Sequence, residues 1–297
     1  MMELATRPLT LSMKTEIEGI RTEAGHKSAS HAFASLYSWQ REMGLSVFLE
    51  DDFFAVKCLL RGANTWFFPC GSEQAVCAFI ASQLGKEQFC LCYLREEDRA
   101  LLNQAFPGRF QIQERPEDAE YLYDRKAQQA MCGKGFVAAR KYIHRLEAGH
   151  SVEVESLCDE NAEEAAALIA GWHSHAVGQG ANGLVDTDAS ATLLRCRKEL
   201  TVSGVLLRVD HAPAAVMAGF PLSEDTFDIA IGKQCCFLTG TAEYLRRAFC
   251  ASLPAAYTLV NGEEDLGIEG LRQMKQKMRP IGQIRMYEGR ARLGGNS

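Results

Sequence analysis

The sequence lacks a long apolar run and any strong excess of basic charge, and we expect no leader segment. No stretch approaches the ~18–20 consecutive apolar residues that a membrane-spanning helix needs. Residues 1–14 contain no apolar segment of the kind that forms the core of a signal peptide. The formal net charge is −6, which is not typical of a dedicated duplex-DNA-binding protein, although a local basic patch is compatible with it. We therefore expect a cytoplasmic protein that does not bind DNA.

Cysteine pairs at metal-binding spacing are also missing, although the chain contains 11 cysteines. There is no Cys-x-x-Cys pair and no Cys/His spacing of a zinc finger. Several cysteines lie in apolar runs such as FCLCYL at 89–94, where a free thiol packs as a small hydrophobic group. We expect no metal site, and the odd number of cysteines suits a reducing cytoplasm. The nearest candidates for a disulfide or a metal are Cys90 with Cys92 on one strand face, Cys235-Cys236, and His173-Ser174-His175.

What the sequence contains is one order of predicted elements, repeated in its two halves. Its 297 residues suffice for two domains. Apolar periodicity predicts in each half a helical region, three strands, a helix, a strand, a helix and a final strand. In the first half these elements cover 29–43, 45–50, 53–60, 64–69, 72–84, 89–94, 96–106 and 109–113. In the second half they cover 161–172 with 189–200, then 204–210, 214–220, 226–231, 239–250, 256–260, 270–278 and 283–287.

Two passes through one element order indicate a duplicated α/β unit, although no residue-level repeat is present. Three antiparallel strands followed by a crossover helix are the order of the acyltransferase fold called GNAT. In that fold the fourth and fifth strands separate and the acyl carrier lies between them. We therefore predict a mixed α/β protein of two tandem GNAT-like units, which by itself fixes no function. The predicted parts are a unit at 1–113, a basic helical connector at 114–155, a unit with the site at 156–291, and a flexible tail at 292–297.

Two segments are more specific than the packing of such a fold requires. The first runs from YLYDRK at 121–126, through GKG at 133–135, to ARKYIHR at 139–145. The second, at 260–275, reads VNGEEDLGIEGLRQMK and is followed by Pro280. Together they resemble a bacterial family that shares the C-terminal catalytic domain of phosphatidylglycerol lysyltransferase. The resemblance extends from Phe33 to Pro280.

This resemblance implies a relation to transferases that move an amino acid from aminoacyl-tRNA to a lipid or a peptidoglycan precursor. It does not reach the membrane-embedded half of the lysyltransferase, so a lipid acceptor would be met at the membrane surface. Two departures bear on whether catalysis is retained. The family's usual Glu-Lys-Ala after the third strand of the second unit is Gly232-Lys233-Gln234 here, and ARKYIHR replaces its central lysine-arginine-asparagine string.

The predicted helix at 270–278 and the loop before it form the candidate site. Arg272, Lys275 and Arg279 are spaced by three and four residues, which puts them on one helix face. The loop with Glu263 and Asp265 follows a strand end, where open α/β sheets often bind ligands. A cationic face beside carboxylates can hold a phosphate or a carboxylated amino acid. Alternatively the face is solvated, with Asp265 or Glu269 paired to Arg272, and Asp265 can equally cap the helix.

Within this site, the resemblance and the chemistry together assign provisional roles. Glu263 is the candidate general base, although a carboxylate needs a raised pKa to act near neutrality and the sequence shows no such shift. Lys233, Arg272 and Lys275 would bind the phosphate or carboxylate of the donor. Asn261 would orient the acceptor.

Coenzyme A is one donor that the pattern suggests. GNAT enzymes bind its pyrophosphate on main-chain amides before a helix, and helix N-termini attract phosphate in general. Thr239, Gly240 and Ala242 occupy that place here, and Gly240 and Ala242 fit the GNAT pattern. Phe237 does not fit, because Gln or Arg is usual there. Acetyl-coenzyme A is therefore a possible donor.

Aminoacyl-tRNA is the other donor. The connector is basic, and phosphate contacts come mostly from Lys and Arg. The alternative is a charged connector helix without a ligand. The candidate tRNA contacts are Arg125, Lys134, Arg140 and Lys141.

Two function hypotheses follow, and the sequence does not decide between them. The first is an acyl- or aminoacyl-transferase, in which an amine or hydroxyl attacks a thioester or aminoacyl ester and a backbone amide stabilises the oxyanion. The second is a non-catalytic protein that binds an anionic metabolite or a tRNA end, which Gly232 in place of the family's glutamate favours. We expect a monomer or weak dimer, because two units in one chain can take the place of a GNAT dimer.

Overall fold

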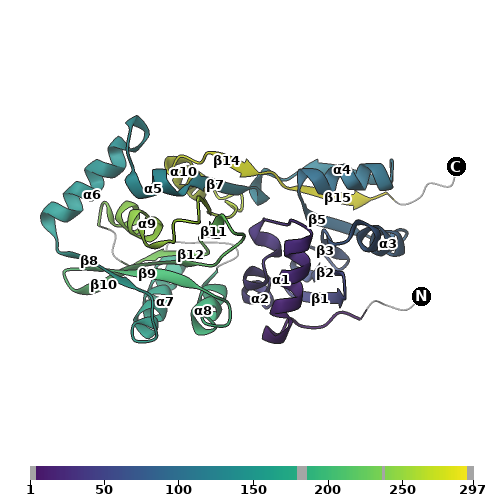
Figure 1. Cartoon of the computed structure of the whole chain (residues 1–297), viewed down its shortest axis with the longest axis horizontal. Coiled ribbons are helices and arrows are strands. Elements are labelled where there is room, and N and C mark those ends of the chain that lie inside the picture. Colours follow the sequence, from purple (N-terminus) through teal and green to yellow (C-terminus); the bar gives the residue numbers. More distant parts are fainter. Residues whose placement is uncertain (1–4, 179–185, 236–237, 293–297) are drawn as a thin grey trace. The chain divides into compact units, whose positions relative to one another are not determined.

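The computed structural model describes residues 5–178, 186–235 and 238–292, except for the side chains of 173–178. The chain forms two units (Figure 1). Unit 1 contains 1–120, 264–271 and 283–297, and unit 2 contains 121–263 and 272–282. Three of the residues considered above for a metal or a disulfide, His173, His175 and Cys236, lie outside the described side chains, as does Phe237.

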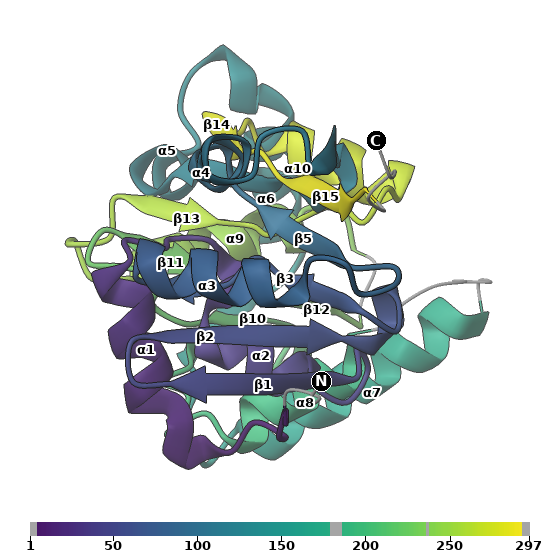
Figure 2. The same ribbon diagram turned by 90° about the vertical axis from the view of Figure 1, so that its right-hand side faces the viewer.

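Unit 1 is built on one seven-stranded sheet. Its strands are β1 (Leu45–Glu50), β2 (Phe53–Cys58), β3 (Thr65–Phe67), β4 (Cys70–Gly71), β5 (Cys90–Leu94), β6 (Phe110–Glu114) and β15 (Tyr287–Ala291). Their order is β1-β2-β3-β5-β15-β6, and β4 pairs with β2. β1 and β2 form the predicted hairpin, with Leu45 opposite Cys58, and appear as antiparallel neighbours in Figure 2. β3 pairs with β5 in parallel.

Most helices of unit 1 lie where the sequence predicts them. They are α1 (Lys14–Glu23), α2 (Phe33–Trp39), α3 (Glu73–Gln83) and α4 (Glu96–Ala105), with 3₁₀ turns at Leu11–Met13, Ala29–His31, Leu59–Arg61 and Pro116–Asp118. Ser72 caps α3 by accepting the Ala75 N–H at 3.3 Å. Gly85 ends this helical region with a φ of 90°, a conformation that glycine adopts without strain. The sequence analysis does not predict α1, whose buried apolar side chains are only Ile17 and Ile20.

Unit 2 contains two four-stranded sheets, ordered β12-β10-β9-β8 and β11-β13-β7-β14. The strands are β7 (Glu120–Asp124), β8 (Val152–Ser156), β9 (Ser203–Val209), β10 (Ala212–Gly219), β11 (Thr226–Asp228), β12 (Ile231–Gln234), β13 (Leu259–Asn261) and β14 (Gly282–Ile284). The helices are α5 (Arg125–Ala130), α6 (Val137–Gly149), α7 (Ala162–Gly178), α8 (Thr187–Arg195), α9 (Thr241–Ser252) and α10 (Glu269–Lys277), with a 3₁₀ turn at Lys134–Phe136.

Helices cover both faces of the first of these sheets. Met217 and Leu207 pack with Phe249 of α9 in one apolar core. Side chains alternate between the two faces of a strand, and α7 contacts β10 and β12 from the other side, where Trp172 meets Lys233. None of the described helices combines the length and the apolar character needed to cross a membrane.

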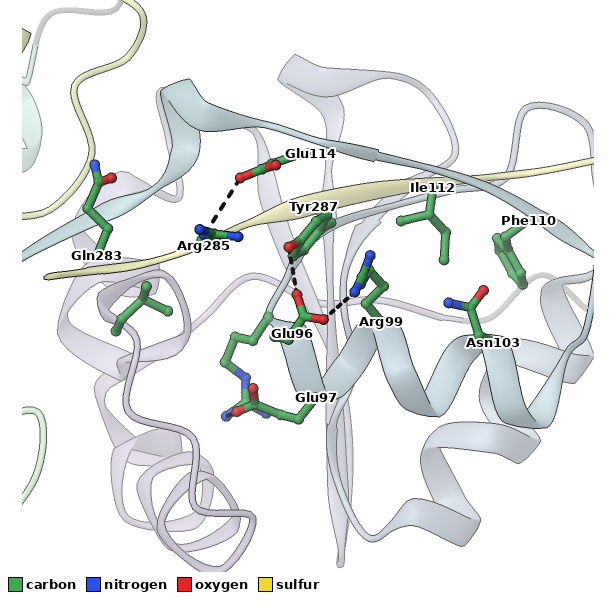
Figure 3. A pocket seen from close by; sticks show the side chains of 12 residues that line it. Glu96, Glu97, Arg99, Asn103, Phe110, Ile112, Glu114, Gln283, Arg285 and Tyr287 are labelled. Carbon is green, nitrogen blue, oxygen red and sulfur yellow. Dashed lines mark hydrogen bonds and ion pairs between the residues drawn. The ribbon is translucent and has the colours of Figure 1, made fainter.

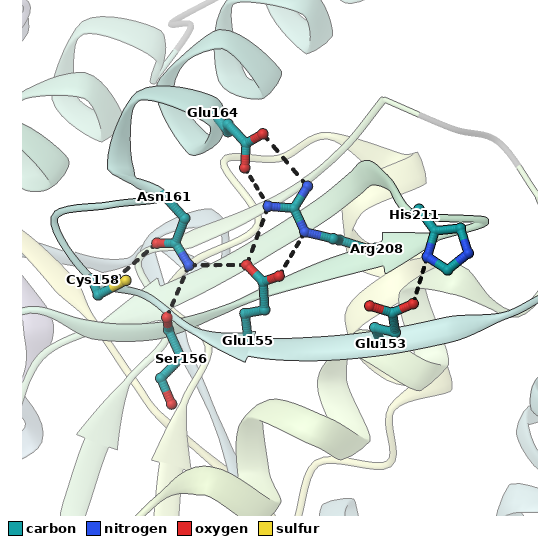
Figure 4. A network of polar contacts seen from close by, with 8 residues as sticks. All are labelled: Glu153, Glu155, Ser156, Cys158, Asn161, Glu164, Arg208 and His211. Carbon is teal, nitrogen blue, oxygen red and sulfur yellow. Dashed lines mark hydrogen bonds and ion pairs between the residues drawn. The ribbon is translucent and has the colours of Figure 1, made fainter.

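A helical connector was expected at 114–155, but the structure has strands as well as helices there. The segment contains β7 and most of β8, which are strands of the two sheets of unit 2. Polar contacts fix the step from β8 into α7 (Figure 4). Arg208 donates to Glu155 at 2.7 Å and also pairs with Glu164 of α7. Asn161 accepts the Cys158 N–H at 2.8 Å just before α7, so β8 and α7 form one continuous part of unit 2.

The predicted last strand at 283–287 is two strands that end up in different sheets. β14 ends at Ile284, whereas β15 begins at Tyr287 and lies between β5 and β6 in the sheet of unit 1. Tyr287 is opposite Leu94 on one side and Glu114 on the other. The predicted unit at 156–291 therefore ends too late. Periodicity identifies a strand but not its partners, which long-range pairing decides. Of the predicted tail, only residue 292 is described.

Candidate functional site

When β8 is counted as the first strand of unit 2, the fourth strand is β11 continued by β12 and the fifth is β13. These two strands separate, as the fold prediction requires. β11 pairs in parallel with β13 over three residues, from Thr226 opposite Leu259 to Asp228 opposite Asn261. β12 continues the fourth strand but pairs with β10, and β13 ends at Asn261. The Ile229 N–H still donates to the Asn261 carbonyl at 2.9 Å, so an open strand edge begins after Ile229.

One extra residue in the fourth strand causes this separation. The Asp228 N–H donates to the Phe220 carbonyl at 2.8 Å, and Ile231 is opposite Ala218. Between these two contacts, β10 advances by two residues, from 218 to 220, whereas the opposite strand advances by three, from 228 to 231. This count defines a β-bulge at Ile229-Ala230, and bulges bend a strand and redirect its pairing.

The bulge also sets the direction of the amides that follow it. The Cys235 N–H donates to the Ala214 carbonyl at 2.9 Å. Because N–H direction alternates along a strand, the amides of Gly232 and Gln234 point away from β10, toward the open edge. No backbone partner for either amide occurs among the described residues. The Gln234 Oε1 atom is also buried without a partner in this part of the chain.

Lys233, a predicted donor contact, already has a carboxylate partner. Its ammonium lies 2.7 Å from the Asp186 carboxylate and 3.6 Å from the centroid of the Trp172 ring. The side chain is buried, and it points to the α7 face of the sheet, opposite to Gly232. A ligand anion at Lys233 would have to share this cation with Asp186.

Glu263 is held in an unusual backbone conformation at the end of β13. Its φ is 55°, in the left-handed region that a non-glycine residue rarely adopts. The Glu263 N–H donates to Asn261 Oδ1 at 2.8 Å, and its carbonyl accepts the Tyr121 N–H at 3.1 Å. Asn261 itself is fully buried. Strained residues of this kind cluster at functional sites, and here two hydrogen bonds impose the strain.

The predicted cationic face of α10 is only partly exposed. Lys275 is 7% exposed, and its ammonium donates to the Gly262 carbonyl. The Lys275 carbonyl accepts the Tyr123 hydroxyl at 3.0 Å. Arg272 is half-buried, and Arg279 is exposed with its Nε donating to the Gly135 carbonyl at 3.2 Å. Lys275 therefore ties α10 to the residues that follow β13, a structural role that the sequence analysis does not predict.

Asp265 makes a local turn in the loop before α10, whereas the structural alternative considered for it was a cap of the helix. Its carboxylate is 1% exposed, and Oδ1 accepts the Gly267 N–H at 2.9 Å. The Asp265 carbonyl accepts the Ile268 N–H just before α10 begins. The side chain thus supports the turn into the helix.

The N-terminus of α9, the predicted coenzyme A contact, is packed against α6. Gly240 has a φ of 102°, and a Cβ there would overlap the Tyr142 carbonyl oxygen of α6. Thr241 is buried, whereas Thr239 and Ala242 are exposed. The main chain of α6 therefore lies against one side of this turn.

The basic stretch separates into buried and exposed residues. Arg125 is 5% exposed and donates to the carbonyls of Tyr257 at 2.6 Å and Cys250 at 3.0 Å. The prediction of a tRNA contact at Arg125 is therefore wrong, because its guanidinium is buried and hydrogen-bonded inside unit 2. Arg140 is exposed but donates to the Met131 carbonyl at 2.6 Å. Lys134 and Lys141 are exposed.

Two of the cysteines considered above for a disulfide or a metal lie in unit 1. Cys90 and Cys92 are free thiols in β5 of unit 1. Burial raises the pKa of Cys90 to about 11 and that of Cys92 well above its usual range. Both thiols therefore stay protonated near neutrality. The described residues contain no group of three or more side chains arranged to hold a metal ion.

Sequence analysis missed Asp228 and Asp186. Asp228 is fully buried on β11, at the last position that pairs with β13. A single carboxylate within the apolar strand TFDIAI was the available signal, because buried carboxylates are rare without a specific partner. Asp186 gave no signal, since its contact with Lys233 joins residues that the fold alone brings together.

Three comparisons place these observations among known proteins. The family model "Phosphatidylglycerol lysyltransferase, C-terminal" matches residues 21–287. No curated protein sequence matches the chain significantly. Solved structures, in contrast, include several similar folds.

A conserved protein of unknown function from Bacteroides thetaiotaomicron VPI-5482 is similar over 98% of this chain and 100% of its own, with 24% identity and a TM-score of 0.88. L-PGS from Bacillus licheniformis is similar over 99% of this chain and 95% of its own, with 16% identity and a TM-score of 0.65. A tandem GNAT protein from the clavulanic acid biosynthesis pathway is similar over 99% of this chain and 100% of its own, with 11% identity and a TM-score of 0.52. These likenesses confirm the predicted α/β fold of tandem GNAT-like units.

Proposed function

The chain belongs to the phosphatidylglycerol lysyltransferase C-terminal family, and we propose that it transfers an acyl or aminoacyl group to an amine or hydroxyl acceptor. The observation that carries this proposal is the open edge of unit 2, where the amides of Gly232 and Gln234 point away from β10. Preorganised amides stabilise the negative charge that develops on a carbonyl oxygen during acyl transfer. A donor ester lying along this edge would have its carbonyl oxygen within reach of one of them.

Glu263 is the proposed general base of this reaction. The acceptor attacks the carbonyl carbon of the donor, Glu263 accepts the acceptor's proton, and the bond from the carbonyl carbon to the leaving oxygen or sulfur breaks. The leaving group then takes up the proton. The pinned left-handed backbone of Glu263 supports this role, since it fixes the direction of the side chain. Asn261 acts as a positioning residue, because its side-chain oxygen holds the Glu263 amide.

An aminoacyl ester of tRNA is the favoured donor in this proposal. The main chain of α6 lies against one side of the turn at Gly240, which weighs against coenzyme A there. Lys134 and Lys141 are exposed and would contact tRNA phosphates, and Arg272 would contact the donor near α10. Acetyl-coenzyme A is the alternative donor, and transfer from it should be compared with that from aminoacyl-tRNA.

A cytoplasmic monomer is part of the same proposal. The described cysteines carry free thiols, as is usual in a reducing compartment. Two GNAT-like units in one chain support a monomer. The acceptor would be a soluble amine or hydroxyl compound, or a lipid met at the membrane surface.

A transfer assay with purified protein tests the proposal. Radiolabelled lysyl-tRNA, alanyl-tRNA or acetyl-coenzyme A would be supplied with a mixture of amine and hydroxyl acceptors that includes phosphatidylglycerol vesicles. We expect transfer from an aminoacyl-tRNA, and Glu263→Gln should slow it by about a hundredfold or more, the range of a lost general base. Glu224→Gln, an exposed carboxylate of the same unit, is the matched control. Full activity in Glu263→Gln would remove the assigned base.

The alternative function, a non-catalytic binder, is favoured by Gly232. A substitution of Gly232 decides between a transferase and a non-catalytic binder. A Cβ at this position would meet only Met217 Cε at 3.6 Å, so Gly232→Glu should fold. If the natural chain binds a charged tRNA without transfer and Gly232→Glu transfers, the chain is a binder derived from an enzyme.

A further inference from the structure

Unit 1 contains a cavity of about 970 Å³ between α4, the strands β6 and β15, and residues 283–285, which belong to this unit (Figure 3). Its apolar side is formed by Phe110, Ile112 and the ring of Tyr287. Phe110, Ile112 and Glu114 alternate along β6 and therefore lie on one face of the sheet. The cavity thus changes from apolar to charged along β6, and Glu114 is at its charged end.

The charged groups of the cavity are three arginines and three glutamates, and most of them are closely paired. Arg95 lies 2.8 Å from Glu97, and Arg99 pairs with Glu96. The Tyr287 hydroxyl donates to Glu96 at 2.6 Å, which lowers the pKa of Glu96. These contacts leave Glu96 little capacity to accept from a ligand.

The remaining pair is different. Arg285 and Glu114 are 4.0 Å apart, and their side chains are 69% and 48% exposed. Arg285 also hydrogen-bonds the Tyr287 hydroxyl. A pair at this distance in contact with water contributes little stability. It can open at small cost, and two opposite charges so placed can each take a closer partner.

We propose that this cavity binds a free α-amino acid with an apolar side chain, whose ammonium group contacts Glu114 and whose carboxylate contacts Arg285. One loose ion pair would be replaced by two short, charge-assisted contacts, and Arg is suited to a bidentate contact with a carboxylate. The side chain of the ligand would lie over Ile112, about 7 Å further along the same face of β6. The equal number of positive and negative side chains matches a zwitterion and disfavours a polyanion.

Titration calorimetry with leucine, methionine and phenylalanine on the full chain tests this site. At least one of them should bind, whereas leucinamide lacks the carboxylate and N-acetylleucine lacks the ammonium group. Both analogues should bind about tenfold more weakly or not at all, the loss expected for one charge-assisted contact. Absence of binding by all three amino acids, or equal binding of leucine and its two analogues, would overturn the proposal.

Two variants localise the binding. Arg285→Gln and Glu114→Gln should each weaken it by about tenfold or more without lowering the thermal midpoint, because the pair is loose. Arg290→Gln is the control, since Arg290 is 70% exposed on β15, pairs with Glu288, and does not line the cavity. Unchanged affinity in both cavity variants would contradict the assignment. Amino acid binding in unit 1 does not depend on the proposed transfer, so each can fail alone.

Discussion

Buried charges in this protein are held by backbone carbonyls as well as by acids. Lys275 donates to Gly262 and Arg125 donates to two carbonyls inside unit 2. A cation taken out of water needs such partners, because burying it without them costs several kcal/mol. A sequence pattern shows that these residues are cationic, but it does not show which of them face solvent. This is why part of the predicted ligand-binding set proves structural.

Two buried histidines of unit 1 are joined through two serines. His26 Nδ1 lies 3.2 Å from Ser28 Oγ, Ser28 Oγ lies 2.9 Å from Ser30 Oγ, and Ser30 Oγ lies 3.0 Å from His31 Nδ1. The His31 Nε2–H donates to the Phe68 carbonyl at 2.8 Å. Burial lowers the pKa of His31 to about 4 and that of His26 well below its usual range.

We predict that unit 1 loses stability as the pH falls from 6.5 toward 4. The unfolded state, with a histidine pKa of about 6.5, binds more protons in this range than the folded state. Stability is therefore full above pH 6.5 and decreases below it. His31 alone should cost about 2 kcal/mol between pH 7 and pH 5. Urea unfolding followed by the fluorescence of Trp39 and Trp66, both in unit 1, measures this loss.

A variant separates this effect from that of other groups. His31→Gln keeps a donor for the Phe68 carbonyl and removes one titration, so its stability should depend less on pH over this range. His144→Gln changes an exposed histidine and should leave the dependence unchanged. Equal pH dependence in wild type and His31→Gln would contradict the assignment to His31.

At the scale of elements, both units contain the same break in the strand before the crossover helix, between β3 and β4 in unit 1 and between β11 and β12 in unit 2. In unit 1, Trp66 is opposite Lys57 and Cys70 is opposite Phe54. The chain therefore advances by four residues from β3 to β4, whereas β2 advances by only three. One extra residue therefore lies in 67–69, as at Ile229-Ala230 in unit 2. The duplication predicted from element order extends to this irregularity.

The two units differ in what surrounds the bulge. In unit 1, His31 donates a hydrogen bond to the Phe68 carbonyl. Ser72 caps the start of α3, and its hydroxyl donates to the Asp52 carboxylate at 2.6 Å. A carboxylate beside a helix N-terminus competes with any phosphate ligand. In unit 2, the N-cap of α9 is Gly240, and no described side chain caps this helix. This difference supports the assignment of the proposed transferase edge to unit 2.

The packing of α6 against α9 can be tested at one glycine. Gly240→Ala should destabilise the protein by about 3 kcal/mol or more, because alanine would be strained at φ 102° and would also overlap the Tyr142 carbonyl. Gly85→Ala is the matched control, with a φ of 90° and no atom near the added Cβ. It should cost only the conformational part, about 1 kcal/mol. Similar unfolding midpoints in urea for the two variants would show that α6 does not contact this turn.

At the scale of the whole molecule, the C-terminal part of the chain belongs to the same unit as its first 120 residues. β15 is an interior strand of the unit 1 sheet, paired with β5 and β6 on its two sides. It carries the buried Tyr287 into the core of that unit. The first 120 residues therefore do not contain the complete sheet.

Removal of β15 should unfold unit 1 and leave the strands of unit 2 complete. A chain that ends at Ile284 would expose the edges of β5 and β6 and lose the packing of Tyr287. We expect the cooperative unfolding transition reported by Trp66 to disappear, while that of Trp172 in unit 2 persists. A chain that ends at Arg292 is the control. An unchanged Trp66 transition after the longer truncation would show that unit 1 does not require β15.

Local patterns in the sequence determined most of the elements, the Ser72 cap, the duplicated order and the family, because apolar periodicity, caps and motifs involve neighbouring residues. The tertiary structure alone decided the partners of β15, the burial of Arg125 and Lys275, and the pairing of Lys233 with Asp186. It also decided where the fourth strand breaks, since one extra residue is defined only against its partner strand. Contacts between residues far apart in the chain fix all of these features, and such contacts leave no periodic signal in a single sequence.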